Sequence, residues 1–159
     1  MKLKRFLSQN KTIPEFIEGG VYGLIYRISE DHCAKVLHIC GDIIQENFVI
    51  DNLYHEFKIM KGLYCKKVSV PKPEGIFKIQ FPQIGKYPAL IMEYINGIKT
   101  WKLENRFDEL STLTSRELEK ARKFGYVPGE DCGVDSNNVL WSDERKKIVL
   151  IDFGNWGEC

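Results

Sequence analysis

The sequence lacks the features that define several large classes of protein. It has no apolar run approaching the ~20 residues that a membrane-spanning helix needs. Its basic N-terminal segment, residues 1–10, has no apolar core long enough for a signal peptide. The five cysteines are odd in number and no two are spaced Cys-x-x-Cys, so neither a disulfide framework nor a zinc site is expected. Reduced cysteines are typical of the cytoplasm, where we expect this protein.

Neither sign of charge is in excess. The chain of 159 residues carries 23 Lys and Arg against 22 Asp and Glu, a net charge of +1. A nucleic-acid or membrane surface attracts strongly basic proteins, so we expect neither as a partner. The sequence is 43% hydrophobic and 28% charged, as in a globular protein of one domain or two small lobes. All three tryptophans are expected in the core: Trp101, Trp141 and Trp156.

Turn residues divide the chain into short apolar segments. The first half has one predicted helix, at about 45–63, and strand patterns at 15–17, 24–28, 33–39, 75–81 and 87–94. The second half has two predicted helices and a hairpin, at 101–110, 114–124 and 139–151. A capping box at Thr114 to Glu117 would begin the second of these helices, and Gly125 would end it. This order predicts an α+β fold rather than alternating βαβ units.

A glycine-rich turn joins the first two predicted strands. It contains Gly19, Gly20, Val21 and Gly23. Glycines allow a backbone to approach phosphates closely and to present its amide groups to them. The alternative is a plain hairpin turn.

A lysine and a glutamate stand at unusual places in their elements. Lys35 lies inside an apolar strand, where a solvent-facing residue is the ordinary interpretation. Glu56 falls on the apolar face of the following helix, with Leu53, Met60 and Leu63. A buried carboxylate without a partner is costly, so we expect Lys35 to pair with Glu56. Such a pair holds a lysine ready for the phosphates of ATP.

Two further motifs complete an ordered series. The strand ending in residues 90–97 is either a plain core strand or a hinge whose backbone would bind an adenine edge. Asp152-Phe153-Gly154 follows an apolar run, and Asn138 lies fourteen residues before Asp152. Amide and carboxylate oxygens suit magnesium, although an Asn in a loop also forms Asx turns.

In this order the motifs resemble those of the protein-kinase-like family, including its small atypical members, from about Phe16 to Gly154. The resemblance implies a two-lobe fold. Residues 1–95 would form a five-stranded antiparallel sheet with one helix, and residues 96–159 a reduced helical second lobe. It also implies ATP and Mg²⁺ as cofactors.

The resemblance implies a role for each matching residue. Gly19, Gly20, Val21 and Gly23 would cover the phosphates, and Lys35 with Glu56 would bind them. The magnesium ligands would be Asn138 and Asp152. The adenine would be contacted by the residues of the pocket and hinge: Ile25, Ala34, Met92, Glu93, Ile95 and Leu140.

The catalytic loop departs from the family pattern. Gly133 stands five residues before Asn138, where the family has its catalytic Asp. Asp135, Asp131 and Glu130 are the alternatives for a surrogate base. Glu18 replaces the first loop glycine, and residues 155–159 do not provide the family's activation segment.

Three functions remain open from the sequence. The first is phosphoryl transfer from ATP to a Ser or Thr hydroxyl of an unknown protein substrate. The second is a pseudokinase that binds nucleotide or a protein partner without chemistry, which Gly133 favours. The third is an interaction module without nucleotide. A reduced second lobe would expose apolar surface, so a homo-oligomer is also open.

Overall fold

The computed structural model describes residues 14–19, 23–37, 46–81 and 85–159. It divides into two compact units. Unit 1 comprises Met1–Tyr54 and Glu74–Tyr94, and unit 2 comprises His55–Pro73 and Ile95–Cys159. Both units are discontinuous in sequence. The predicted lobe boundary at residue 95 stays a prediction.

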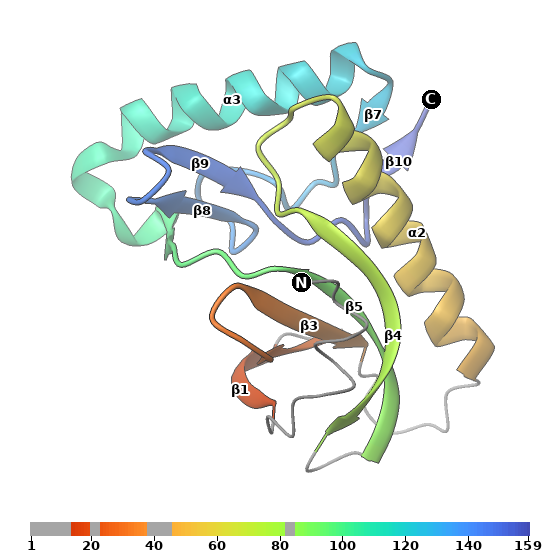
Figure 1. Cartoon of the computed structure of the whole chain (residues 1–159). Helices are drawn as coiled ribbons and strands as arrows, with labels where there is room; N and C mark the ends of the chain where they lie inside the picture. Colours follow the sequence, from red (N-terminus) through yellow and green to blue (C-terminus); the bar gives the residue numbers. More distant parts are fainter. Residues whose placement is uncertain (1–13, 20–22, 38–45, 82–84) are drawn as a thin grey trace. The chain divides into compact units, whose positions relative to one another are not determined.

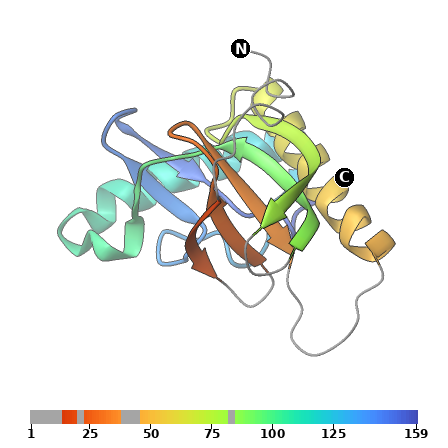
Figure 2. The ribbon, with the colours of Figure 1, turned by 60° about the horizontal axis from the view of Figure 1, so that its bottom comes forward.

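Unit 1 is built on a five-stranded sheet with the order β1-β2-β3-β5-β4 (Figure 1). Its strands are β1 (Glu15–Gly19), β2 (Gly23–Arg27), β3 (His32–Leu37), β4 (Pro73–Phe81) and β5 (Gly85–Glu93). The antiparallel sheet is twisted, as the turned view shows (Figure 2). All five strands were predicted, and the end of the third prediction, residues 38–39, lies outside the described residues.

One face of this sheet carries the core of unit 1. The buried members of the core are Tyr26, Ile28, Ala34, Val36, Phe81, Ala89 and Ile91. The rings of Tyr26 and Phe81 lie 4.8 Å apart between centroids. Ala34 and Val36 alternate along β3 and therefore share a face. Cys33 and Lys35 point to the other face and are buried as well, as in a central strand covered on both sides.

The helix α2 (Glu46–Cys65) crosses the boundary between the units. The predicted apolar face is confirmed, because all four of its residues are 2% exposed or less: Leu53, Glu56, Met60 and Leu63. Lys67 ends the helix with a left-handed φ of 59°. Its N–H donates to Tyr64 O and that of Val68 to Leu63 O, which is the Schellman pattern with lysine in place of the usual glycine.

Unit 2 combines a long helix with small sheets. Its helix α3 (Phe107–Lys123) packs along β9 (Lys147–Leu150), which pairs with β8 (Val139–Ser142) and then β6 (Ile98–Lys99) (Figure 1). The short strands β7 (Tyr126–Val127) and β10 (Gly157–Glu158) form a separate pair. Two 3₁₀ turns, η1 (Thr100–Lys102) and η2 (Glu104–Arg106), precede α3.

The prediction of two helices between residues 101 and 124 is wrong, because one helix runs through the expected break. Leu110, Thr114 and Ala121 are buried at spacings of four and seven, so a single helical face continues across the proposed capping box. Thr114 is therefore no N-cap. Glu117 does not cap either: its carboxylate accepts the Ser69 N–H at 2.8 Å. The predicted end is confirmed at Gly125, whose φ is +83°.

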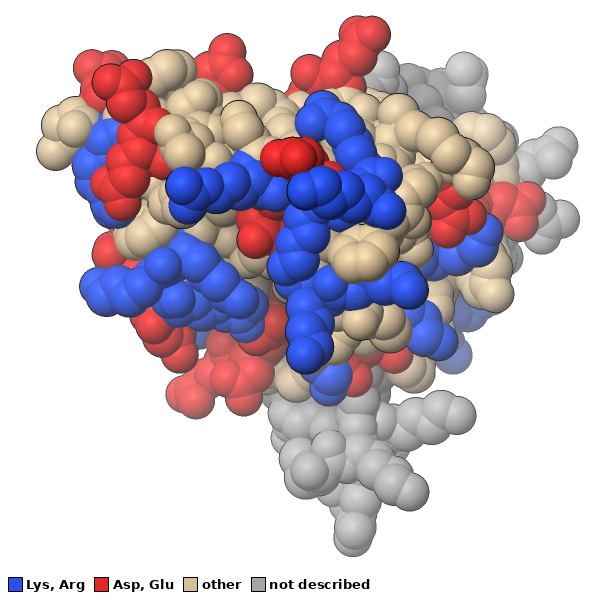
Figure 3. Space-filling view, turned by 90° about the horizontal axis from the view of Figure 1, so that it is seen from above, with Lys and Arg blue, Asp and Glu red and all other residues tan. Residues whose placement is uncertain are grey.

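The surface carries both signs of charge. Figure 3 shows both Lys and Arg and Asp and Glu side chains on one face, and the two signs are nearly equal in number in the whole sequence. Along α3 the pairs include Lys123 with Glu119 at 3.0 Å, an exposed contact worth little to stability. Within the described part of the chain, no helix combines the length and apolarity needed to cross a bilayer.

Candidate functional site

The β8–β9 hairpin brings the two predicted magnesium ligands to one end of unit 2. Val139 pairs with Leu150, so the residues before β8 and after β9 lie at the same end of the hairpin. The Ile151 N–H also donates to the Asn138 backbone oxygen at 2.9 Å. Asn138 and Asp152 are thus neighbours through the register of two short strands.

Asp152 has an unusual backbone conformation. Its φ is +62°, a left-handed value that few residues other than glycine adopt, although Asp and Asn tolerate it best. The Asp152 carboxylate is exposed, and its Oδ1 accepts the Gly154 N–H at 3.4 Å. Such conformations cluster at functional sites. The turn out of β9 therefore presents the carboxylate that the sequence predicts as a ligand.

The next residue is held by a buried acid. The Phe153 N–H donates to Glu56 Oε1 at 3.1 Å, and Glu56 is 2% exposed. The Phe153 ring is fully buried and meets the Trp156 ring edge-on at 5.3 Å. Glu56 thus supports the Asp-Phe-Gly turn. Its pairing with Lys35, a residue of unit 1, stays a prediction.

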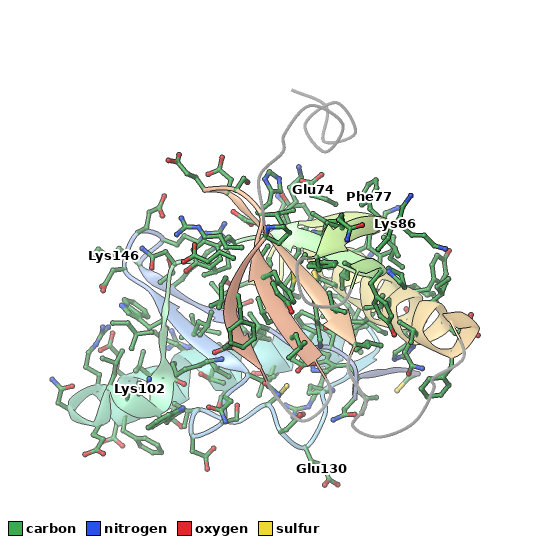
Figure 4. All side chains as sticks on the ribbon, turned by 90° about the horizontal axis from the view of Figure 1, so that it is seen from below. Glu74, Phe77, Lys86, Lys102, Glu130 and Lys146 are labelled. Carbon is green, nitrogen blue, oxygen red and sulfur yellow. The ribbon has the colours of Figure 1, made fainter. Side chains whose placement is uncertain are left out.

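Among the three alternative bases, Asp131 has a direct link to a predicted metal ligand. Asn138 Nδ2 donates to Asp131 Oδ2 at 2.9 Å. This bond turns the amide nitrogen to Asp131 and leaves the amide oxygen of Asn138 as its group for a cation. Glu130 projects away from the loop into solvent (Figure 4).

Gly133, at the family's Asp position, serves the loop in another way. A Cβ built on Gly133 would lie 2.5 Å from Asp135 Oδ1, so the glycine makes room for the Asp135 carboxylate. The Ser136 N–H closes a turn on Gly133 O, and the Ser136 hydroxyl accepts the Asn138 N–H at 3.1 Å. A side chain at residue 133 would have to displace the Asp135 carboxylate.

Burial and charge act on a thiol next to Asp131. Burial raises the pKa of Cys132 to about 11, helped by the carboxylates of Asp131 and Asp152 and opposed by the Trp156 N–H. Both carboxylates therefore lie near enough to Cys132 to act on it. This thiol is neutral at ordinary pH and is no nucleophile.

The predicted residues of unit 1 are ordered by the sheet. Ile25 pairs with Lys35, and Lys35 pairs with Leu90 on its other side. Lys35 is only 6% exposed, so the interpretation as a solvent-facing lysine is wrong. A Cβ on Gly23 would lie 3.2 Å from Lys35 Cε, which places the end of the glycine turn against this side chain. Gly20 and Val21 lie outside the described residues.

The predicted adenine contacts fall in both units. In unit 1, Ala34 is fully buried, and Met92 is nearly so. In unit 2, Ile95 and Leu140 form a cluster with Val149, against which Ile151 packs. Gly19 and Glu93 end their strands, β1 and β5. Their contacts with a nucleotide stay predictions.

Sequence reasoning missed two side-chain hydrogen bonds in unit 2, from Trp101 to Asn137 and from Asn155 to Asp131. Trp101 is 44% exposed, so its prediction as a core residue is wrong; its Nε1 donates to Asn137 Oδ1 at 3.0 Å. Asn155 Nδ2 donates to Asp131 Oδ2 at 3.4 Å. The only signal in the sequence is position, because Asn137 precedes Asn138 and Asn155 directly follows the Asp-Phe-Gly motif.

The donor set fits a magnesium ion that also binds phosphate. Among the residues that the structure describes, no group of three or more His, Cys, Asp and Glu side chains could hold a metal ion. Asn138 and Asp152 together offer only two protein ligands, one amide oxygen and one carboxylate. Mg²⁺ is commonly held by one or two protein oxygens together with phosphates and waters, so these two residues suit that use.

Comparison with known proteins finds similarity in structure but not in sequence. No protein-family model matches the chain, and no curated protein does. A solved structure that matches is the co-crystal structure of WbdD and the kinase inhibitor LY294002, with a TM-score of 0.55 and 17% identity. The match covers 90% of this chain and 33% of the WbdD chain, so this chain spans about a third of its length. At this identity the likeness concerns the fold alone, and it supports a kinase-like fold.

Proposed function

We propose that the chain binds ATP with Mg²⁺ and transfers the γ-phosphoryl group to a Ser or Thr hydroxyl of a protein. The observation that carries this proposal is the hairpin end of unit 2. There Asn138 and the left-handed Asp152 are neighbours through the backbone bond from Ile151 to Asn138, and the Asn138 side chain donates to Asp131. A kinase-like fold supports the proposal.

The predicted residues of each unit have different roles in this proposal. In unit 2, Asn138 and Asp152 would hold the metal, which supplies positive charge to the phosphates. In unit 1, the glycine turn would cover the phosphates and the nearly buried Lys35 would bind them.

Asp131 is the carboxylate that the geometry favours as the base for the acceptor hydroxyl. In the transfer, the hydroxyl oxygen bonds to the γ phosphorus while the bond from that phosphorus to its bridging oxygen breaks. ADP leaves, and the hydroxyl proton passes to Asp131. Phosphoryl transfer depends mostly on positioning and charge, so a carboxylate two residues before the usual place is compatible with the chemistry.

One observation favours a pseudokinase as the second candidate. Gly133 occupies the usual Asp position, and the Asp135 carboxylate fills the space beside it. In that case nucleotide binding would remain while transfer would be absent.

Binding and transfer assays on the purified chain test the proposal together. ATP with Mg²⁺ at 100 times its Kd should stabilise the fold by about 2.7 kcal/mol. Radiolabel from [γ-³²P]ATP should reach a protein acceptor. Lys35→Ala and Asp152→Ala should abolish transfer, whereas the exposed controls Lys123→Ala and Asp51→Ala should leave it intact. Absence of any thermal shift contradicts both nucleotide-binding candidates, and a shift without transfer selects the pseudokinase.

A further inference from the structure

The segment after the Asp-Phe-Gly motif is bonded to the loop that carries Asp131. The Asn155 side chain donates to Asp131 Oδ2, and the indole N–H of the buried Trp156 donates to Cys132 Sγ at 3.1 Å. The N–H of Trp156 closes the segment on Phe153 O. Neighbouring residues of one segment thus bond to neighbouring residues of the loop.

Close packing at Gly129 supports this contact independently. A Cβ built on Gly129 would lie 2.7 Å from Asp131 Oδ1, 3.1 Å from Asn155 Cβ and 3.3 Å from Asn155 O. Gly129 is therefore tight against both residues at once. A side chain there would have to displace them.

The same carboxylate oxygen receives both amides. Asn138 donates to Asp131 Oδ2 at 2.9 Å and Asn155 donates to it at 3.4 Å. Two donors on Oδ2 and the packing of Gly129 beside Oδ1 fix the orientation of the carboxylate. A side chain in an exposed loop is not held in place by strand pairing, so its orientation depends on these partners.

We propose that Asn155 is a positioning residue, which holds the Asp131 carboxylate from the side of the Asp-Phe-Gly turn. The inference rests on the proposed function and deepens it. It explains how a loop with Gly133 at the usual Asp position keeps a carboxylate in a defined orientation. Residues 152 to 155 then join the metal ligand Asp152 to the acceptor carboxylate through three peptide bonds.

Substitutions of Asn155 test the role of its amide. Asn155→Ala should lower kcat about 10-fold, in the range for groups that orient a functional side chain, while the KM for ATP stays within about twofold. Asn155→Asp keeps the size but places a second carboxylate beside Asp131. It should lower kcat further than Ala, because two neighbouring carboxylates repel each other where the amide had donated a hydrogen bond. The matched control is Asn52→Ala, which removes an exposed helix amide that donates to Phe48 O and should leave kcat unchanged.

Glycine substitutions test the packing. Gly129→Ala should reduce kcat by at least as much as Asn155→Ala, because the new methyl group meets Asp131 Oδ1. Gly157→Ala is the control, since its Cβ would lie at an ordinary 3.9 Å from Val127. Thermal unfolding of each variant checks that the fold is retained.

A second measurement does not depend on activity. In NMR spectra, Asp131→Asn should shift the side-chain NH₂ signals of both Asn138 and Asn155, whereas Asp135→Asn should shift neither. Unchanged signals overturn the inference.

Transfer separates this inference from the proposed function. If the unaltered chain transfers phosphate but Asn155→Ala and Asn155→Asp retain full kcat, the inference fails and the proposed function stands. If the unaltered chain transfers nothing, the proposed function fails and the positioning role falls with it.

Discussion

Lys35 in unit 1 and Asp131 in unit 2 are held in place in different ways. In unit 1, Lys35 is placed by register, between Ile25 on one side and Leu90 on the other. In unit 2, Asp131 lies in a loop and is placed by side-chain hydrogen bonds from Asn138 and Asn155. A ladder tolerates changes in single side chains, because backbone groups make its bonds. A loop depends on each donor, so single substitutions should disturb Asp131 more than they disturb Lys35.

Removal of one buried ring from each unit is the strongest test of this contrast. Phe81→Ala in unit 1 and Phe153→Ala in unit 2 should each lower the free energy of unfolding by about 3–5 kcal/mol, because both rings are fully buried. Only Phe153→Ala should also release Trp156, which packs on that ring. Denaturant unfolding measures the loss of stability, and acrylamide quenching of tryptophan fluorescence measures the release. Equal quenching in the two variants would contradict the contrast.

The same contrast explains what could be predicted from the sequence. Strands in unit 1 and the buried face of α2 follow from periodicity, which is a local property. The adjacency of Asn138 and Asp152 follows from a short hairpin with a recognisable turn. Gly125 ends α3 because a left-handed residue is needed there, and glycine is the residue that adopts this conformation most easily.

The parts of the fold and the site that could not be predicted depend on contacts between residues far apart in sequence. The bond from Asn155 to Asp131 spans 24 positions, and that from Phe153 to Glu56 spans 97. No period or turn signal records such a pair. The false capping box at Thr114 has a related cause, since tertiary burial of this residue continued the helix where a local motif favoured a start.

The buried thiols should make the free energy of unfolding depend on pH in both units, with an effect of intermediate size. The unfolded thiols ionise near the ordinary value of 9.0, whereas burial raises the pKa of Cys33 in unit 1 to about 12 and that of Cys132 in unit 2 to about 11. Above pH 9 the unfolded chain binds fewer protons than the folded chain. The free energy of unfolding should therefore fall as pH rises, by about 1.4 kcal/mol per pH unit for each thiol.

Alanine variants of the two cysteines measure how much of this pH-dependent loss of stability comes from each unit. Cys132→Ala should flatten the stability profile between about pH 9 and 11, and Cys33→Ala should flatten it up to about pH 12. Denaturant unfolding under reducing conditions at each pH provides the profiles. Variants with the same slope as the unaltered chain would show that these thiols do not ionise differently on folding.

The smallest expected effect is one in which the units should not differ at all. Gly85 in unit 1 and Gly125 in unit 2 have φ values of +78° and +83°, and among the described residues no atom lies within 4 Å of a Cβ built on either. Alanine at each position should therefore cost only the left-handed backbone, about 1–2 kcal/mol. Gly157→Ala serves as the control, because its backbone is not left-handed and its Cβ would have an ordinary contact.

Chemical denaturation of the three variants measures this directly. Equal losses for Gly85→Ala and Gly125→Ala mean that backbone conformation has the same cost in a strand-built and a loop-rich unit. The contrast between the units then lies in side-chain bonds alone. A much larger loss at Gly125 would contradict this, and it would implicate the Cys159 N–H, which donates to Gly125 O at 2.8 Å and fastens the last residue of the chain to the end of α3.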